Sequence, residues 1–456
     1  MKMWEGRFAK KNDPLMETFN RSLEFDKRMI EEDIIGSMAW AKALAKCGVL
    51  KNIEARKLVR ALKELFRNKS SLRFLKNDED VHMAVERLLT DKLGALGKKI
   101  HTGRSRNDQV AVDTRLYMKK EVAAIRSGLC GLMAALRDSA RQYSGVMMPS
   151  FTHLQMAQPV LLSHYLMAWF FMLERDASRF CGCRMRLDIM PLGSGAVAGS
   201  GFPVNRAFLA RELGFAGVSD NSMDSVGDRD YVVEFLSAAA IAATHLSRLA
   251  EDLIIFASPG YQYLELSDAY STGSSMMPNK KNPDSLELVR GKTGRLIGNL
   301  VTMLTVTKGL PFTYNKDLQE DKEALFDSID TLKALLSIFT GVLKTLRFSK
   351  VRMEGSLDGD LLATDLADAL VKSGMPFRDA HHVVGRIVLD CRNSGKSLLQ
   401  LAPKELAAYS AKFPKRLKLS FKESIRRRSL YGGTGPASVE AQLRKADAIL
   451  AKMGKR

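Results

Sequence analysis

Residues 109–142 form a run of 34 residues without a proline, and this run limits the possible folds more than any other feature of the chain. Only Gly128 and Gly131 weaken its helical pattern. An uninterrupted segment of this length predicts a helix well beyond the usual length of roughly 8–20 residues. Such a helix buries its apolar side in an extended bundle, so an elongated helical core is expected.

Several other segments have helical periodicity and support the same fold class. Residues 53–66 place Leu58, Leu62, Leu65 and Phe66 on one face. Residues 231–257 have almost no polar side chain for three turns, which predicts burial on most sides. Residues 284–308 and 322–346 continue the pattern, and no convincing run of alternating strand residues occurs. We therefore predict an all-α protein.

Two polar stretches suggest domain boundaries, near residues 99–104 and near residues 352–359. They divide the chain into three mostly helical domains: an N-terminal domain (1–103), a central long-helix bundle (104–352) and a small C-terminal domain (353–456). Helices that are apolar on several faces also predict packing between subunits.

The net charge of +19 is distributed unevenly, because residues 401–456 hold fourteen Lys and Arg against four Asp and Glu. No nucleic-acid module is recognisable there and aromatic residues do not interleave the charges, so a solvated basic face is favoured and nucleic-acid binding is not expected. A basic field would also attract an anionic substrate.

No stretch reaches the roughly 18 unbroken apolar residues of a membrane span, and MKMWEGRFAKKND lacks the apolar core of a secretory signal. Five cysteines suit free thiols in a reducing compartment, and Cys181-Gly-Cys183 has no nearby third and fourth ligands for a metal. We therefore expect a cytoplasmic protein that does not enter a membrane.

Two polar clusters precede or follow the first long helical run. Residues 98–115 contain His101, Arg104, Arg106 and Asn107 ahead of a helix start, where backbone N–H groups and arginines suit a carboxylate. A plain capping loop with surface arginines explains the same residues. His153, within THLQ, becomes a catalytic candidate only if a carboxylate orients it, since a lone histidine is more often structural.

A third cluster, STGSSMMPNKKNP (271–283), is a loop of small residues that leads into a helix. Asn282 as N-cap, Pro283 as first helical residue and an acid in the first turn predict a strong helix start. Lys280 and Lys281 just before it make an oxyanion or carboxylate site plausible, and a mobile solvated loop equally so.

The fourth cluster, residues 310–323, is either a pocket rim or an ordinary helix connection; it holds Tyr314, Lys316, Gln319 and Lys322. The chain has no phosphate-binding GxxxxGK[ST] motif, no HExxH zinc motif, no GxSxG and no GxGxxG after a strand. The remaining possibility is a cofactor-free site built from Ser, His, Lys, Arg and Asn.

These clusters also carry a resemblance to a known family. GSSMMPNKKNP resembles the signature loop of the fumarase/aspartase superfamily. The flanking segments are similar to those of the argininosuccinate lyase family, which is related to the δ-crystallins, and they occur in order from residue 3 to about residue 443: MWEGRF, FNRSLEFDKRM, HTGRSRNDQVAVDTRL, THLQMAQPVLLSHYLMAW, PLGSGAVAG, DRDYVVEFL, TYNKDLQEDKEALFD and GGTGPASVEAQL.

The resemblance implies an all-α fold of three helical domains, whose long central helices form the core of a homotetramer with active sites shared between subunits. It implies reversible elimination of argininosuccinate to L-arginine and fumarate, the last step of arginine biosynthesis, with no cofactor and no metal. Another fumarate-releasing lyase of the superfamily, or a catalytically silent structural homologue, is the alternative.

By resemblance, Ser274 is the general base, and His153, oriented by Glu287, is the acid or proton relay. The reverse assignment, with His153 as the base, stays open. The substrate contacts that the resemblance implies are Ser22, Asn107, Thr152, Lys280, Asn282, Tyr314, Gln319 and Lys322, with Arg106 and Arg229 as further candidates.

Overall fold

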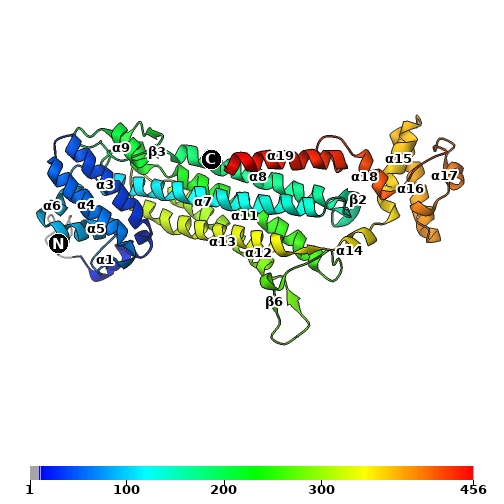
Figure 1. Ribbon diagram of the computed structural model, residues 1–456, viewed down its shortest axis with the longest axis horizontal. Coiled ribbons are helices and arrows are strands. Elements are labelled where there is room, and N and C mark those ends of the chain that lie inside the picture. Colours follow the sequence, from blue (N-terminus) through cyan, green and yellow to red (C-terminus); the bar gives the residue numbers. More distant parts are fainter. Residues whose placement is uncertain (1–9, 11, 455–456) are drawn as a thin grey trace. The chain divides into compact units, whose positions relative to one another are not determined.

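A computed structural model describes residue 10 and residues 12–454, so the MWEGRF segment lies outside the described residues. Helices dominate the described chain (Figure 1), which confirms the all-α class. The longest helices are α7 (Arg106–Gln142), α8 (Leu162–Leu187), α11 (Asp230–Ala257), α12 (Asp284–Thr307) and α13 (Asp321–Thr345). Helices α7, α11, α12 and α13 agree with the predicted helical segments to within three residues at either end, whereas α8 was not among them.

Helix α11 is apolar enough to raise the question of a membrane span. By length and composition alone it is the one described helix that passes this test, and 56% of its most apolar window is buried inside the protein. Its buried residues include Phe235, Leu236 and Leu246. Such burial is what the sequence predicted for a helix without a solvated face, and it is typical of a core helix.

Contacts divide the chain into two compact units. The first takes the chain up to Arg126, Ser178–Ile241 and Gly294–Leu332; the second takes Ser127–Ala177, Ala242–Thr293 and the chain from Lys333 onward. The long helices each contribute residues to both. The division at residues 103 and 352 that the sequence suggests stays a prediction.

Several of the shorter helices in the first unit build a core around Trp40. Leu58, Leu62 and Leu65 are buried, as the periodicity of residues 53–66 predicts. Asp80 caps α5, since its side chain accepts a hydrogen bond from the Met83 N–H at 2.7 Å. The shorter helices of the first unit are α1 (Pro14–Asn20), α2 (Leu23–Asp26), α3 (Ile30–Lys46), α4 (Asn52–Arg67), α5 (Val81–Leu93), α6 (Ala95–Lys98), α9 (Arg206–Leu213) and α10 (Ser222–Gly227). Of these, α3, α4, α5 and α9 supply most of the buried side chains around Trp40.

The second unit has its own core, in which Leu366, Leu370, Ile387 and Leu398 are buried. Its shorter helices are α14 (Lys350–Gly355), α15 (Ala363–Lys372), α16 (Phe377–Ser394), α17 (Pro403–Tyr409), α18 (Phe421–Arg427) and α19 (Pro436–Gly454). Short 3₁₀ turns link elements of both units: η2 (Lys27–Met29), η3 (Lys69–Ser71), η4 (Lys99–His101), η5 (Asp268–Tyr270), η6 (Lys316–Glu320), η7 (Gly359–Leu362) and η8 (Leu398–Gln400).

The strands are short and occur in pairs. An antiparallel hairpin, β1 (Met147–Thr152) with β2 (Gln155–Leu161), pairs Thr152 with Gln155 and shifts register between Pro149 and Phe151. The other pairs are β3 (Ile189–Met190) with β4 (Gly217–Val218), β5 (Leu264–Glu265) with β8 (Arg347–Phe348), and β6 (Thr272–Gly273) with β7 (Lys281–Asn282). The sequence did not reveal the β1–β2 hairpin, because prolines interrupt it and its turn lacks glycine.

Candidate active site

The residues that the sequence singles out divide between the two units. The first unit contains Ser22, Arg106, Asn107, Arg229, Tyr314, Gln319 and Lys322. The second contains Thr152, His153, Ser274, Lys280, Asn282 and Glu287. Most of the first group are buried or half-buried, whereas most of the second are exposed.

In the first unit, Ser22, Gln319 and Lys322 line one small cavity together with Asp26. Ser22 is 3% exposed, and its hydroxyl donates a hydrogen bond to Asp26 Oδ2 at 2.6 Å. The second oxygen of Asp26 accepts from the Val81 N–H at 3.0 Å. Burial raises the pKa of Asp26. The cavity thus joins residues that are about 300 positions apart in the sequence.

Arg106 and Asn107 form the first turn of α7. Ser105 caps the helix, since its hydroxyl accepts from the Asn107 N–H at 3.2 Å. Arg106 forms an ion pair with Asp80, with Nε 2.9 Å from Oδ2, and Asn107 Nδ2 donates to the carbonyl of Ala196 at 3.2 Å. The polar loop at residues 98–115 therefore serves as a cap and also faces the N-terminus of α5.

Arg229 and Lys322 share one carboxylate, that of Asp321. The guanidinium Nε of Arg229 donates to Asp321 Oδ2 at 2.5 Å, and Lys322 Nζ contacts Oδ1. All three side chains are buried. Burial lowers the pKa of Lys322 while Asp321 opposes this shift, and burial raises the pKa of the Tyr314 phenol beside Arg229. Asp321 thus holds both cations together in one buried cluster.

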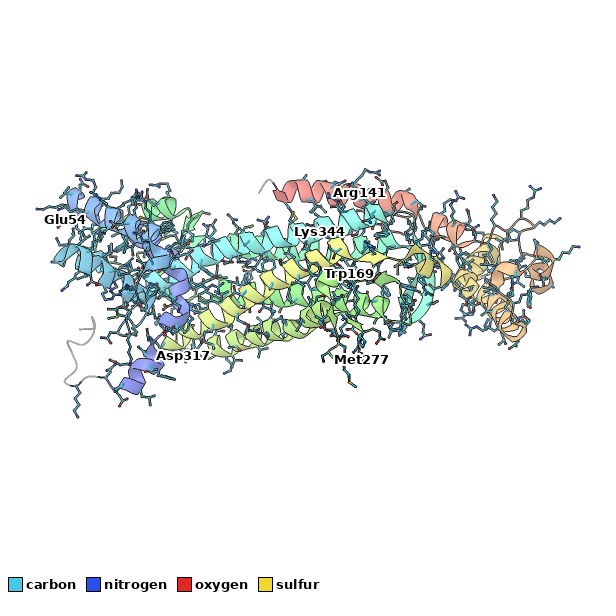
Figure 2. All side chains as sticks on the ribbon, turned by 60° about the horizontal axis from the view of Figure 1, so that its bottom comes forward. Glu54, Arg141, Trp169, Met277, Asp317 and Lys344 are labelled. Atoms are coloured by element: carbon cyan, nitrogen blue, oxygen red, sulfur yellow. The ribbon has the colours of Figure 1, made fainter. Side chains whose placement is uncertain are left out.

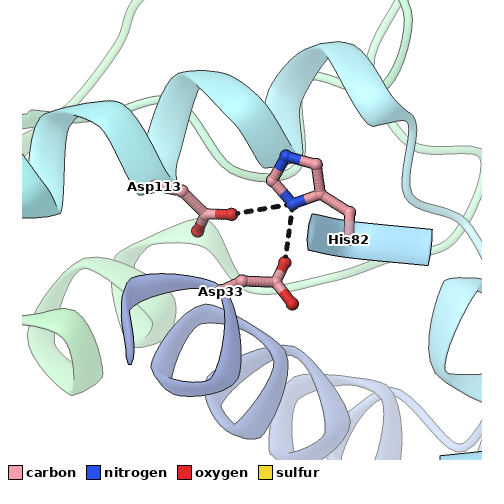
Figure 3. Close-up of side chains that lie close together, drawn as sticks. All are labelled: Asp33, His82 and Asp113. Atoms are coloured by element: carbon pink, nitrogen blue, oxygen red, sulfur yellow. Dashed lines mark hydrogen bonds and ion pairs between the residues drawn. The ribbon is translucent and has the colours of Figure 1, made fainter. Parts of the chain in front are cut away.

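Sequence reasoning missed a buried network centred on His82, which Figure 3 shows. Its Nδ1 lies 2.9 Å from Asp33 Oδ1 and 3.2 Å from Asp113 Oδ2. Helices α3, α5 and α7 each supply one of the three residues. Burial lowers the pKa of His82, but hydrogen bonds to both carboxylates outweigh it and raise the pKa to about 10. The imidazole is therefore a buried cation at neutral pH.

The three residues also have the composition of a metal site, with ligand atoms within 4.8 Å of one another. A metal ion would have to replace the proton that His82 Nδ1 shares with both carboxylates. The buried guanidinium of Arg104 contributes a second positive charge to Asp33 and Asp113. Burial and the neighbouring Asp33 raise the pKa of Asp113 to about 8, so at neutral pH Asp33 is the main ionised carboxylate beside two cations. The arrangement therefore suits a protonated histidine better than a divalent ion.

In the second unit, His153 occupies the turn of the β1–β2 hairpin. His153 and Leu154 both have positive φ, 55° and 59°, as the two central residues of a type I′ turn require. Non-glycine residues seldom adopt this conformation, and such strain clusters at functional positions. Both side chains are exposed, as is Thr152. The turn therefore presents His153 to solvent instead of burying it as a structural histidine.

The signature loop forms a second hairpin, β6–β7, which extends from its unit (Figure 1). The Ser274 hydroxyl accepts hydrogen bonds from the N–H groups of Met276 and Met277, at 3.2 and 3.0 Å. Met276 is 87% exposed, and Figure 2 shows Met277 projecting outward. Lys280 is exposed, while Lys281 pairs with Asp268 at 2.6 Å. The loop thus has internal structure and little cover.

Helix α12 begins at Asp284, one residue later than the sequence suggested. Pro283 supplies the carbonyl that accepts from the Glu287 N–H at 3.1 Å, and Asn282 pairs in strand β7 instead of capping the helix. Glu287 is exposed on the first turn. No hydrogen bond or ion pair between described residues of this chain joins Glu287, His153 and Ser274 to one another.

Known protein families and solved structures resemble this chain over most of its length. A family model described as Lyase matches residues 6–298, and one described as Argininosuccinate lyase C-terminal matches residues 360–426. A solved structure of EDDS lyase in complex with formate is 28% identical, with a TM-score of 0.83 over 98% of this chain and 92% of that chain. Class II fumarase from Schistosoma mansoni, 16% identical, shares the fold with a TM-score of 0.75 over 89% and 90%. The helical fold and the signature loop thus define a lyase of the fumarase/aspartase superfamily.

Curated relatives narrow this class. The argininosuccinate lyases of Symbiobacterium thermophilum and Moorella thermoacetica are each 50% identical over 456 residues, covering 99% of this chain and 99% and 98% of theirs. The chain belongs to the argininosuccinate lyase family. Its five cysteines are free thiols, as the sequence predicted.

Proposed function

We propose that this protein catalyses the reversible elimination of argininosuccinate to L-arginine and fumarate, as a carbon–nitrogen lyase in the last step of arginine biosynthesis. The observation that carries the proposal is full-length similarity, at 50% identity, to argininosuccinate lyases of two bacteria. The position of the signature loop next to the first turn of α12 supports it. The cytoplasm, which supplies a reducing environment for free thiols, is the proposed location.

The reaction removes a proton from the carbon beside the carboxylate of the succinate portion and breaks the bond from the neighbouring carbon to a guanidino nitrogen. Loss of that proton gives a dianionic aci-carboxylate, and stabilising this charge is the main task of the site. Lys280, Asn282 and N–H groups of the signature loop are proposed for this role. Removing one such donor is expected to cost about 3–4 kcal/mol in the barrier.

Ser274 is proposed to accept the proton, and His153 to return one to the departing guanidino nitrogen, so that both protons are accounted for. A serine hydroxyl is a weak base until cations and N–H groups lower its pKa. The Ser274 oxygen already faces two backbone N–H groups, and Lys280 is six residues away in the same hairpin. Glu287 is proposed to orient His153.

For the substrate itself, the proposed contacts are those of the first unit together with Thr152. The cations Arg106, Arg229 and Lys322 suit the carboxylates of argininosuccinate. Hydrogen-bonding groups suit its amino and carboxylate ends; these are Ser22, Asn107, Thr152, Tyr314 and Gln319. The buried state of Ser22 and Lys322 supports this, because buried polar groups of a pocket discriminate strongly between ligands.

We further propose a homotetramer in which several subunits complete each active site, with the long helices at its centre. Ile297, Val301 and Leu304 lie on one face of α12 and are exposed, Val301 to 56%. On the same face, Gly294 and Gly298 have no atom within 4 Å of where a Cβ would stand. An exposed apolar face with glycines allows a helix of another subunit to approach closely.

Fumarate absorbance during incubation with argininosuccinate tests the function. Ser274→Ala should bind argininosuccinate nearly normally, measured by calorimetry, while turnover falls by at least about a thousandfold. Normal turnover by this variant would show that Ser274 is not the base. Fumarate release from malate, aspartate or adenylosuccinate but not from argininosuccinate would refute the proposed substrate.

A further inference from the structure

The N-terminal helices form a groove that the proposed reaction does not use. It lies between α3, α4 and α9, has a volume of about 1020 Å³, and is lined by Lys42, Lys46, Arg56, Arg60, Lys63 and Arg67. Helix α3 packs against both α4 and α9, so one unit contains the whole groove. These six side chains define the basic groove.

One wall of the basic groove is a row of cations on α4. Arg56, Arg60, Lys63 and Arg67 are spaced by four, three and four residues, so they share one face of the helix. The opposite face is buried through Leu58 and Leu62 and anchors the helix in the core. At 1.5 Å per residue, the row extends over about 16 Å. The charges are therefore arranged along a line and do not converge on one point.

Acidic side chains leave most of this charge unbalanced. The lining includes two carboxylates. Glu212 pairs with the groove's own Lys42 at 2.5 Å, which leaves five of the six cations, and Glu64 pairs with Lys92 outside the groove. Within the part of the chain that the structure describes, no ion pair is recorded for Arg56, Arg60, Lys63, Arg67 or Lys46. Like charges four residues apart destabilise a helix, and a bound polyanion would relieve that repulsion.

The other wall combines charge with an aromatic ring. Phe208, on α9, is half-buried in the groove, and Lys46 Nζ lies 4.6 Å from the centre of its ring. Val59 and Ala55 add apolar surface. Proteins that bind single strands combine cations along the backbone with an aromatic surface for bases. Three of the four cations on α4 are arginines, whose forked donors match phosphate oxygens.

We propose that the basic groove binds the phosphate backbone of a single-stranded nucleic acid. The row on α4 contacts successive phosphates, and a base packs against Phe208. A small anion would occupy only one or two of the cations, because they are spread over about 16 Å. This interaction is separate from the basic C-terminal segment, residues 401–456, and from the lyase reaction.

Fluorescence anisotropy of a labelled twelve-nucleotide single-stranded RNA, titrated with the full chain, tests the proposal. Five cations are available for phosphates, because Lys42 pairs with Glu212. The logarithm of the association constant should then fall against the logarithm of the salt concentration with a slope of about −3.5, a loss of roughly a hundredfold in affinity between 50 and 200 mM. The variant with Arg56, Arg60, Lys63 and Arg67 all replaced by Gln should show a slope of about −0.7. Its fumarate release should match that of the parent protein.

A matched control removes the same charge elsewhere, replacing Lys404, Lys415, Lys418 and Lys422 by Gln. This control should bind RNA with nearly the parental slope. An equal loss in both variants would show that net charge alone acts, and would overturn the proposal. Equal affinity for a poly-glutamate peptide, displacement of RNA by a nucleoside triphosphate at equimolar concentration, or no binding at 50 mM salt would each overturn it as well.

Discussion

Replacing His82 by glutamine tests whether the buried network of the N-terminal unit holds a positive charge. His82 is 2% exposed and contacts Asp33 and Asp113 through the same nitrogen. Glutamine is of similar size and can donate to one carboxylate, but it is neutral. His82→Gln would therefore leave the buried Asp33 carboxylate without this cation, and breaking such a buried pair typically costs about 3–5 kcal/mol.

The pKa of His82 gives a second value for its contribution to stability and shows how this contribution changes with pH. It is raised to about 10 in the folded protein from an ordinary value of 6.5, so the folded state holds this proton more tightly than the unfolded chain. The stabilisation is fully present below pH 6.5 and is lost as pH rises through 10. The histidine alone then contributes roughly 4 kcal/mol at pH 7 and roughly 1–2 kcal/mol at pH 9.

Urea unfolding followed by circular dichroism, at pH 7 and at pH 9, measures this contribution. The difference in unfolding free energy between the parent and His82→Gln should be large at pH 7 and shrink by at least half at pH 9. His382→Gln, at an exposed histidine, controls for the substitution itself and should change little at either pH. A destabilisation that is the same at both pH values would refute the reasoning, because a neutral His82 would contribute packing and not charge.

Two further substitutions test features of the candidate site. Asp321→Asn removes the carboxylate between Arg229 and Lys322, so kcat/KM for argininosuccinate should fall at least about tenfold and the pKa of Lys322 should drop further. The alkaline limb of the kcat/KM profile should then move to lower pH; an unmoved limb would contradict a positioning role for Asp321. Leu154→Gly should relieve the strain of a positive φ and raise stability by up to about 1 kcal/mol in thermal unfolding, and a lower midpoint would contradict the strain.

The sequence predicts four of the five long helices well, because each is long enough for its apolar period to repeat many times; α8 was not predicted. It fails at the β1–β2 hairpin, where His153 and Leu154 adopt positive φ without the glycine or asparagine that signals such a turn. The sequence predicts Asn282 as the N-cap of a helix that begins at Pro283. The helix begins at Asp284, and Asn282 instead pairs with Thr272 between strands β6 and β7. Local sequence preferences for helix capping do not reveal that a strand pairing uses the same residue.

The His82 network was missed for a different reason. Asp33, His82 and Asp113 lie on three separate helices, so only the tertiary fold brings them together. A signal was present nonetheless. Asp33 lies between Ile30 and Ile34, at the spacing of the apolar face of a helix. A charged residue on such a face is seldom buried unless it has a partner. Such a residue predicts a buried partner without identifying it.

The two groups of candidate residues differ in their access to water, and this difference bears on how the site works. Ser22 and Lys322 are buried, whereas His153, Lys280 and Glu287 are exposed. A hydroxyl surrounded by water cannot remove a weakly acidic carbon-bound proton, because water screens the cations that would lower its pKa. The exposed Met276 and Met277 beside Ser274 supply apolar surface that could exclude that water once another surface covers the loop. Assembly with other subunits or closure over substrate would thus activate Ser274, and activity should depend on protein concentration wherever the assembly dissociates.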